Sequence, residues 1–381
     1  MRSSTWLTLA LLIVGASLLV PRVSAALADN AAHDQQDFGI FYRSAGCVVR
    51  GGCSPYTATE QIAPNLAPPH ALLLVTPLLP LTQPVAYGAF LLCSIAVLAT
   101  QAWRVTRTIG LTLTPIAWLA TAAVVGSSGL MESLITSGNI YAFLAWPAVS
   151  AWRQWRRGHV VIAGVWLGVI ASCKVLVFLA LFYFVVHGAW RAAMAMLGTA
   201  AAIVAIGVAG FGSAPYAAWL EMLSRAPMSG QFHDASIMQT LLRWLTPTLQ
   251  FAPIADAAGL VRPIWAAAAG LVATLAVTVP RRAADAAVLA VLSAALLASP
   301  IGWILAAWWL IAPAVAMWLT GGIFERAALS GVALLLWLPS TLPLAGQPSP
   351  FLTVTVGSLN FWCVITLLVI AVAAGRGGAK A

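Results

Sequence analysis

A polar stretch near the N-terminus, residues 34–56, stands out in a chain whose residues are 61% hydrophobic. Its sequence is DQQDFGIFYRSAGCVVRGGCSPY, with carboxylates at Asp34 and Asp37 and a guanidinium at Arg43. A carboxylate can take the proton of an attacking hydroxyl, and cations can steady a leaving phosphate. We therefore predict Asp37 as a general base, with Asp34 as its substitute, because residues three apart share a helix face. The alternative is that Asp37 caps a short helix or is a solvated loop acid.

The composition predicts an all-α polytopic membrane protein. Only 8% of the 381 residues are charged, and the apolar runs exceed what one aqueous core could bury. Backbone polar groups in lipid need partners within their own segment, and the runs lack the alternation of barrel strands. We expect a single integral membrane domain over residues 1–381, a bundle of about 12 transmembrane helices.

The expected spans lie near residues 6–26, 84–103, 109–126, 139–152, 159–172, 175–189, 192–211, 260–279, 286–299, 301–319, 328–345 and 354–374. With the N-terminus inside, the basic clusters between the spans fall on the cytoplasmic face and both termini are cytoplasmic. This pattern explains the net charge of +9 without a nucleic-acid partner. The segment from Arg2 to Ala25 also fits a secretory signal with a cleavage site, so its retention or cleavage is left open.

Two long polar connections then lie on the exterior face, residues 27–70 and 212–258. Most of the Asp and Glu residues fall in them. Loops of this length in a compact bundle are usually functional. We expect the first exterior loop to be the catalytic one.

Several segments in order resemble landmarks of glycosyltransferase family 87. The polar stretch from Asp37 to Tyr56 resembles the opening of the family. Further similar segments are Asn65–His70, Gly138–Tyr141, Ala163–Gly168 with Lys174, His233–Gln239 ahead of Arg243, and Ala298–Trp303. Leu305 and Ala306 occupy the place of a His pair found in many members.

The resemblance implies a GT-C-like bundle whose exterior loops carry the site. It implies an inverting transferase that uses a polyprenyl-phosphate-sugar donor and a glycan or glycolipid acceptor of the cell envelope. The sugar is a hexose or pentose, such as mannose or arabinose. The expected location is the bacterial inner membrane, among membrane lipid, with the active site on the periplasmic or exterior face.

Lys174 and Arg43 are the candidates for the donor phosphate. Lys174 lies in the apolar stretch SCKVLVFLALF, where an ionisable group is expensive and therefore tends to be functional. The alternative is that it extends to the interface and binds nothing. Arg43 can clamp a phosphate in bidentate fashion, or contact a lipid headgroup.

Four further residues are candidates for the donor phosphate or the sugar. His70 and His233 can hydrogen-bond either group, although a lone loop histidine is often only solvated. Asn139 can bind a hydroxyl or a phosphate oxygen, or cap a helix. Trp303 can stack on a sugar, or anchor the chain at the interface.

The sequence predicts neither a metal site nor a cofactor. The five histidines form no pair at helical spacing, no D-x-D occurs, and D-x-x-D alone is a weak signal for a divalent ion. There is no Walker loop and no glycine-rich opening of a soluble nucleotide-binding unit. Cys47 and Cys53 can close a small disulfide in an oxidising compartment, or remain free thiols.

A secondary transporter or lipid flippase is the competing hypothesis. Lys174 would then be a coupling or substrate charge within the membrane. The gathering of carboxylates in exterior connections and the lack of a visible repeat favour the transferase. A product assay separates the two.

Overall fold

The computed structural model describes residues 2–32, 36–51, 53–56, 65–225, 230–248, 251–338 and 349–377. These residues form α-helices and short 3₁₀ helices, with one isolated bridge pair in place of any sheet. The prediction of an all-α fold is therefore confirmed. By their contacts, the residues divide into two compact units.

The first unit contains residues 1–146, 201–226 and 337–340. Its helices are α1 (Arg2–Ala32), α2 (Gln36–Arg50), η2 (Pro69–Leu74), η3 (Thr76–Leu78), α3 (Gln83–Thr108), α4 (Pro115–Gly126), α5 (Gly129–Ser137) and α10 (Ala214–Arg225), with one end each of α6 (Tyr141–Arg156) and α9 (Trp190–Phe211).

The second unit contains residues 147–200, 227–336 and 341–381. Its helices, besides the remaining parts of α6 and α9, are α7 (Val160–Cys173), η4 (Val175–Phe178), α8 (Leu179–Val186), α11 (Ile237–Leu245), η5 (Ala258–Leu260), α12 (Val261–Val277), α13 (Ala284–Ala298), η6 (Ile304–Ala306), α14 (Ala307–Thr320), α15 (Ile323–Trp337), α16 (Pro350–Val354), η7 (Val356–Ser358) and α17 (Leu359–Gly377). The last residue of α15, Trp337, belongs to the first unit.

The helices are those of a polytopic membrane protein. Within the described residues, five helical segments are long and apolar enough to cross a membrane: Trp6–Ala32, Gln83–Thr108, Trp190–Phe211, Ala258–Val277 and Pro350–Arg376. The pair α4 and α5, bent by 61°, passes the same test together, and four more apolar helices are shorter. Each of the twelve expected segments contains a helix or part of one, but the number of membrane spans stays a prediction.

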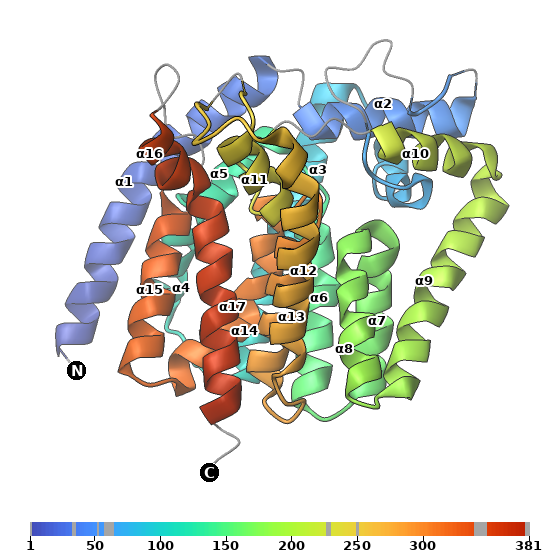
Figure 1. Cartoon of the computed structure of the whole chain (residues 1–381). Coiled ribbons are helices and arrows are strands. Elements are labelled where there is room, and N and C mark those ends of the chain that lie inside the picture. The colour runs from blue at the N-terminus through green and yellow to red at the C-terminus, as the bar shows by residue number, and fades with distance from the viewer. Residues whose placement is uncertain are drawn as a thin grey trace. The chain divides into compact units, whose positions relative to one another are not determined.

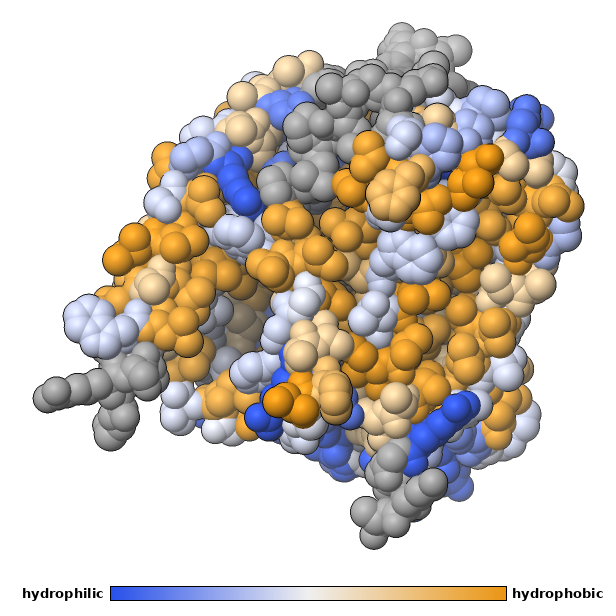
Figure 2. All heavy atoms as spheres, turned by 60° about the vertical axis from the view of Figure 1, so that its left-hand side comes forward, coloured by the Kyte–Doolittle hydropathy of each residue, from blue (hydrophilic) through white to orange (hydrophobic). Residues whose placement is uncertain are grey.

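Hydrophobic side chains face outward, as lipid contact requires. Leu92 is 71% exposed, Ile206 68% and Phe351 73%. On the face drawn in Figure 2, such residues cover most of the described surface. A protein in water rarely exposes an apolar surface so extensive.

In the first unit, α1 packs closely on α4 because glycines remove the side chains between them. A Cβ on Gly15 would lie 2.8 Å from the backbone carbon of Ala123, and one on Gly126 would lie 2.7 Å from Cδ1 of Leu19. Small residues of this kind let membrane helices approach backbone to backbone. The contact fixes α4 against the N-terminal helix (Figure 1).

In the second unit, α13 is the central helix. Every residue from Ala286 to Leu297 is buried, and α12, α14 and α17 all contact this helix (Figure 1). A helix that is apolar all round is suited to this position. Around it, α7 approaches α9 through Gly164 and Gly168, where an added Cβ would lie 2.4 Å and 2.5 Å from the carbonyl oxygens of Ala192 and Met196.

The two connections expected to be loops contain helices. Residues 36–50 form α2, which buries Phe38, Ile40, Phe41 and Ala45 on one side. Apolar residues at this spacing make one face of an amphipathic helix. The second connection contains α10 and α11.

Candidate functional site

Asp37 lies in the first turn of α2, where a carboxylate is stabilised by the positive end of the helix dipole. It is half-buried, and its Oδ2 accepts a hydrogen bond of 2.6 Å from Nδ2 of Asn139. Asn139 is only 4% exposed and lies between α5 and α6. Two polar residues separated by 102 positions are therefore paired.

Gly138 allows this pair to form. It ends α5 in the left-handed region, with φ of +63°. A Cβ there would lie 2.6 Å from Cβ of Phe38, the residue after Asp37. Glycine is the residue that tolerates both the positive φ and the close approach.

The start of α2 is held by aromatic packing. The fully buried ring of Phe38 lies 5.6 Å from the ring of Tyr87 and 5.1 Å from that of Phe90, centroid to centroid, both on α3. Tyr87 in turn donates its hydroxyl to the carbonyl of Ile135 on α5. The packing joins α2, α3 and α5 around the Asp37–Asn139 pair.

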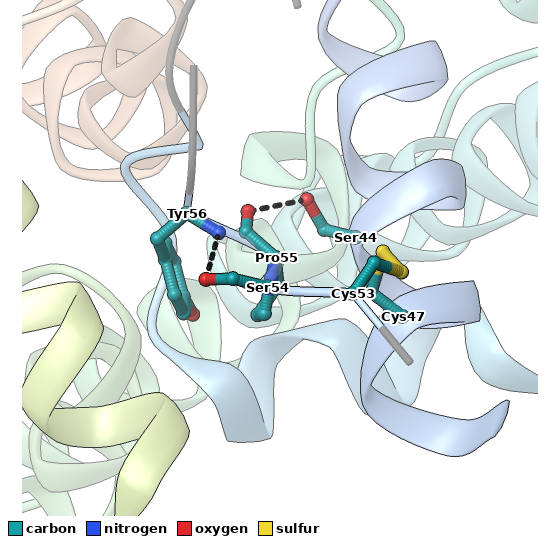
Figure 3. The surroundings of a disulfide bond; sticks show 6 residues. All are labelled: Ser44, Cys47, Cys53, Ser54, Pro55 and Tyr56. Atoms are coloured by element: carbon teal, nitrogen blue, oxygen red, sulfur yellow. Dashed lines mark hydrogen bonds between the residues drawn. A yellow bond between two sulfur atoms is a disulfide. The ribbon is translucent and has the colours of Figure 1, made fainter. Parts of the chain in front are cut away.

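The end of α2 is closed by a disulfide. Of the two alternatives left open for Cys47 and Cys53, the structure has the disulfide, with a Cα–Cα distance of 5.1 Å. Figure 3 shows the hydroxyl of Ser44 donating to the carbonyl oxygen of Pro55 at 3.0 Å. The chain leaving α2 is thereby turned back along the helix toward Tyr56.

Tyr56 and two other rings hold the segment Asn65–His70. The hydroxyl of Tyr56 donates to the carbonyl of Ala67 at 2.9 Å, and Nε1 of Trp219 donates to that of Leu66 at 3.2 Å. His70 is 5% exposed, and its Nδ1 is 3.1 Å from the hydroxyl of Tyr216. Burial, with the nearby Tyr216, raises the pKa of Tyr56 well above its usual value. His70 is thus an internal residue rather than a solvated loop histidine.

A second cluster, in the second unit, joins the segment before α11 to the turn before η6. Asp234 pairs with Trp303 as an isolated bridge, and the amide of Ile304 donates to the carbonyl of His233 at 2.9 Å. The carboxylate of Asp234 accepts from the amides of Ser236 at 2.8 Å and Gly302 at 2.9 Å. His233 and Trp303, predicted separately from sequence, are therefore neighbours.

Arg243 of α11 secures this cluster from inside. It has no exposed surface, and it donates to the carbonyls of Gln231 and Asp234 and to the hydroxyl of Thr240. Burial lowers the pKa of Arg243 to about 10, opposed by the charge of Asp234. Burial raises the pKa of Asp234, opposed by Ser236, Arg243 and Gly302. Arg243 and Asp234 therefore have a structural role, supporting the cluster from inside.

Lys174 lies at a break between α7 and η4. Its backbone is extended, with φ of −137° and ψ of 96°, and its side chain is half-buried. Arg43 is a half-buried residue of α2. Asp34 lies outside the described residues.

Sequence reasoning did not select Tyr216, Asp234 or Arg243 as site residues. Asp234 and Arg243 occur in a segment used for the resemblance. The signal that could have identified them is a pair of opposite charges, one just before a short amphipathic helix and one in its last turn. Tyr216 gives no such sign, because a single tyrosine in a connection has no distinctive spacing. In the part of the chain that the structure describes, no three His, Cys, Asp or Glu residues are grouped to hold a metal.

The comparisons with known proteins identify the family. No curated protein and no solved structure matches the chain. The family model of glycosyltransferase family 87 matches residues 65–300, more than half of the chain, including Asn139 and the Asp234–Arg243 cluster. Asp37 precedes the matched residues but is bonded to one of them. The chain is a membrane protein that belongs to glycosyltransferase family 87.

Proposed function

We propose that this glycosyltransferase moves a hexose or pentose from a polyprenyl-phosphate carrier to a glycan or glycolipid of the cell envelope. The reaction takes place on the exterior face of a bacterial inner membrane, with inversion. Asp37 takes the proton of the acceptor hydroxyl while that oxygen bonds to the anomeric carbon. The bond from that carbon to the phosphate oxygen breaks, and polyprenyl phosphate leaves.

The hydrogen bond between Asp37 and Asn139 is the observation that supports this proposal most. A general base must be held in one orientation to reach its proton, and the buried amide of Asn139 restrains one carboxylate oxygen. We assign the proton of the acceptor hydroxyl to this carboxylate. The half-buried position of Asp37 leaves part of the residue open to a substrate.

Lys174, Arg43, His233 and Trp303 are our candidates for the donor side. A lysine at a helix break within an apolar region is energetically unfavourable unless it binds a ligand or reaches the interface. Its positive charge suits a phosphate group. Trp303 offers a half-exposed ring, on which a sugar can stack, next to His233. His70 contributes indirectly, through the segment that it supports.

The test is transfer of radiolabelled sugar from polyprenyl-phosphate sugars in membranes that contain the wild-type chain, Asp37→Asn or Asp29→Asn. Asp37→Asn keeps the size of the side chain and removes the base, so we expect transfer to fall by about 10²–10⁴-fold. Asp29, an exposed carboxylate of α1, is the matched control and its variant should retain activity.

Equal loss in both variants, or none in either, would remove Asp37 from the mechanism and bring Asp34 forward as the base. If the wild-type chain transfers no label from any donor while it moves a lipid-linked sugar across vesicles, the proposed polyprenyl-phosphate reaction is wrong. Expression of each variant is checked by immunoblot, so that loss of protein is not taken for loss of chemistry.

A further inference from the structure

Arg22 is a charged residue within the apolar segment Trp6–Ala32 of α1. A guanidinium in a membrane-spanning helix is costly, so it is kept where it finds hydrogen-bond acceptors inside the protein. Its acceptors here are backbone carbonyls. Nη1 donates to the carbonyl of Ser127 and, at 2.8 Å, to that of Trp337.

The carbonyl of Ser127 belongs to the break between α4 and α5. A helix that ends leaves carbonyls without intrahelical donors, and in lipid no water replaces them. Several side chains supply donors at this break: Nε1 of Trp337 to Val124 at 3.0 Å, and the hydroxyl of Ser127 to Val124 at 3.1 Å. Arg22 adds the one full charge to this group, and its guanidinium also lies 4.6 Å from the centroid of the Trp337 ring.

Asn30, two residues before the end of α1, contacts the C-terminal end of α5. Asn30 is 1% exposed, and its Nδ2 donates to the carbonyl of Thr136 at 2.6 Å. Thr136 lies in the last turn of α5, two residues before Gly138 and three before Asn139. The break just before α5 and the last turn of α5 are therefore both bonded to α1.

We propose that Arg22 and Asn30 are positioning residues, which set α5 so that Asn139 meets Asp37. α5 has nine residues, too few to be stable alone, and its placement depends on contacts with other elements. A rotation or shift of α5 moves Asn139, because only Gly138 separates them. The catalytic part of this inference rests on the proposed function, whereas the structural part does not.

The structural part is tested by hydrogen exchange of the full-length chain in lipid nanodiscs, read on peptides that cover residues 129–139. Arg22→Met removes a charged donor, and the amides of α5 should exchange roughly tenfold faster. Arg104→Met is the matched control: Arg104 of α3 also lies 4.6 Å from a tryptophan ring, that of Trp146, and it donates a hydrogen bond to Gln101 of its own helix. It should leave α5 unchanged.

Asn30→Ala supplies a second, milder variant should Arg22→Met fail to fold. It should speed exchange in the last turn of α5 with little change at the start of that helix. Unchanged exchange in both α1 variants overturns the proposal. An equal rise in the Arg104 control also overturns it, since the effect would then be a general loosening.

The catalytic part is tested by kinetics in two backgrounds. If Arg22 acts through Asn139, Arg22→Met should lower kcat roughly tenfold in the wild-type chain and less than about twofold in the Asn139→Ala chain, with KM for the donor little changed. Equal losses in the two backgrounds would show that Arg22 acts independently of Asn139. A wild-type chain without transferase activity would count against the proposed function, while the exchange experiment would still decide the bracing of α5.

Discussion

At the scale of single residues, the fold depends most on buried polar side chains. Arg243 has no exposed surface, yet its guanidinium donates to the backbone carbonyl of Asp234, and its charge acts on the carboxylate of the same residue. Removing one member of such a pair leaves the other charge buried without compensation. The turn containing Trp303 depends on the same carboxylate, through the amide of Gly302.

Arg243→Met should lower the free energy of unfolding by about 3–5 kcal/mol, because Asp234 then keeps its burial and loses its neighbouring charge. Thermal unfolding in detergent, followed by the fluorescence of the tryptophans, measures the change. Arg262→Met, at an exposed position of α12, should change stability by less than about 0.5 kcal/mol. Similar values for the two variants would mean that Arg243 is not a structural charge.

Glycines determine the packing at the scale of the helices. Gly164 and Gly168 lie one turn apart on α7 and bring this helix against the backbone of α9. The segment from Ala163 to Gly168, which sequence alone associated with the family, therefore has a packing role. The atoms nearest to a Cβ added at either glycine belong to Ala192, Met196 and Thr199 of α9.

Gly168→Ala should destabilise the second unit, because its new methyl would lie 2.5 Å from the carbonyl oxygen of Met196. Gly198→Ala, on the partner helix α9, is the matched control: its Cβ would meet nothing within 4 Å. Alanine favours a helix over glycine by up to about 1 kcal/mol, so this control should be neutral or stabilising. The unfolding temperatures of the two variants, measured in the same detergent, test this prediction. Equal shifts of the unfolding temperature in both variants would contradict the packing role of Gly168.

The helices could largely be predicted from the sequence, whereas the breaks between them could not. Apolar runs predicted a helix in each expected segment, since hydropathy follows from composition. Residues 127–138 lie between two of the expected spans and no helix was predicted there, whereas α5 follows α4 after a 61° bend. Arg22 and Trp337 donate hydrogen bonds to carbonyls at this bend, and long-range partners of this kind leave no local pattern in the sequence. The pairing of Asp37 with Asn139 was hidden for the same reason.

At the scale of the whole chain, the distribution of charge predicts the orientation in the membrane. The basic residues predicted to be cytoplasmic include Arg153, Arg156 and Arg157 at the end of α6 and just beyond it. The disulfide between Cys47 and Cys53 is the kind of bond that persists outside the cytoplasm. Both features favour α2 on the exterior face.

Fusions at three points of the chain test this orientation. Alkaline phosphatase, which is active only outside the cytoplasm, should be active when joined after Tyr56 or after Arg225 and inactive when joined after Arg157. A fluorescent protein that folds in the cytoplasm should give the reverse pattern. Activity of the phosphatase only after Arg157 would invert the predicted topology and put Asp37 on the cytoplasmic face.

The two acceptors of Arg22 are made at very different times during synthesis. α1 leaves the ribosome first, and the carbonyl of Trp337 follows 315 residues later. Until then the break between α4 and α5 lacks both the indole donor and the second anchor of the guanidinium. The N-terminal unit therefore acquires its final set of hydrogen bonds only when almost the entire chain has been translated, so a chain interrupted before Trp337 leaves this break incompletely capped in the membrane.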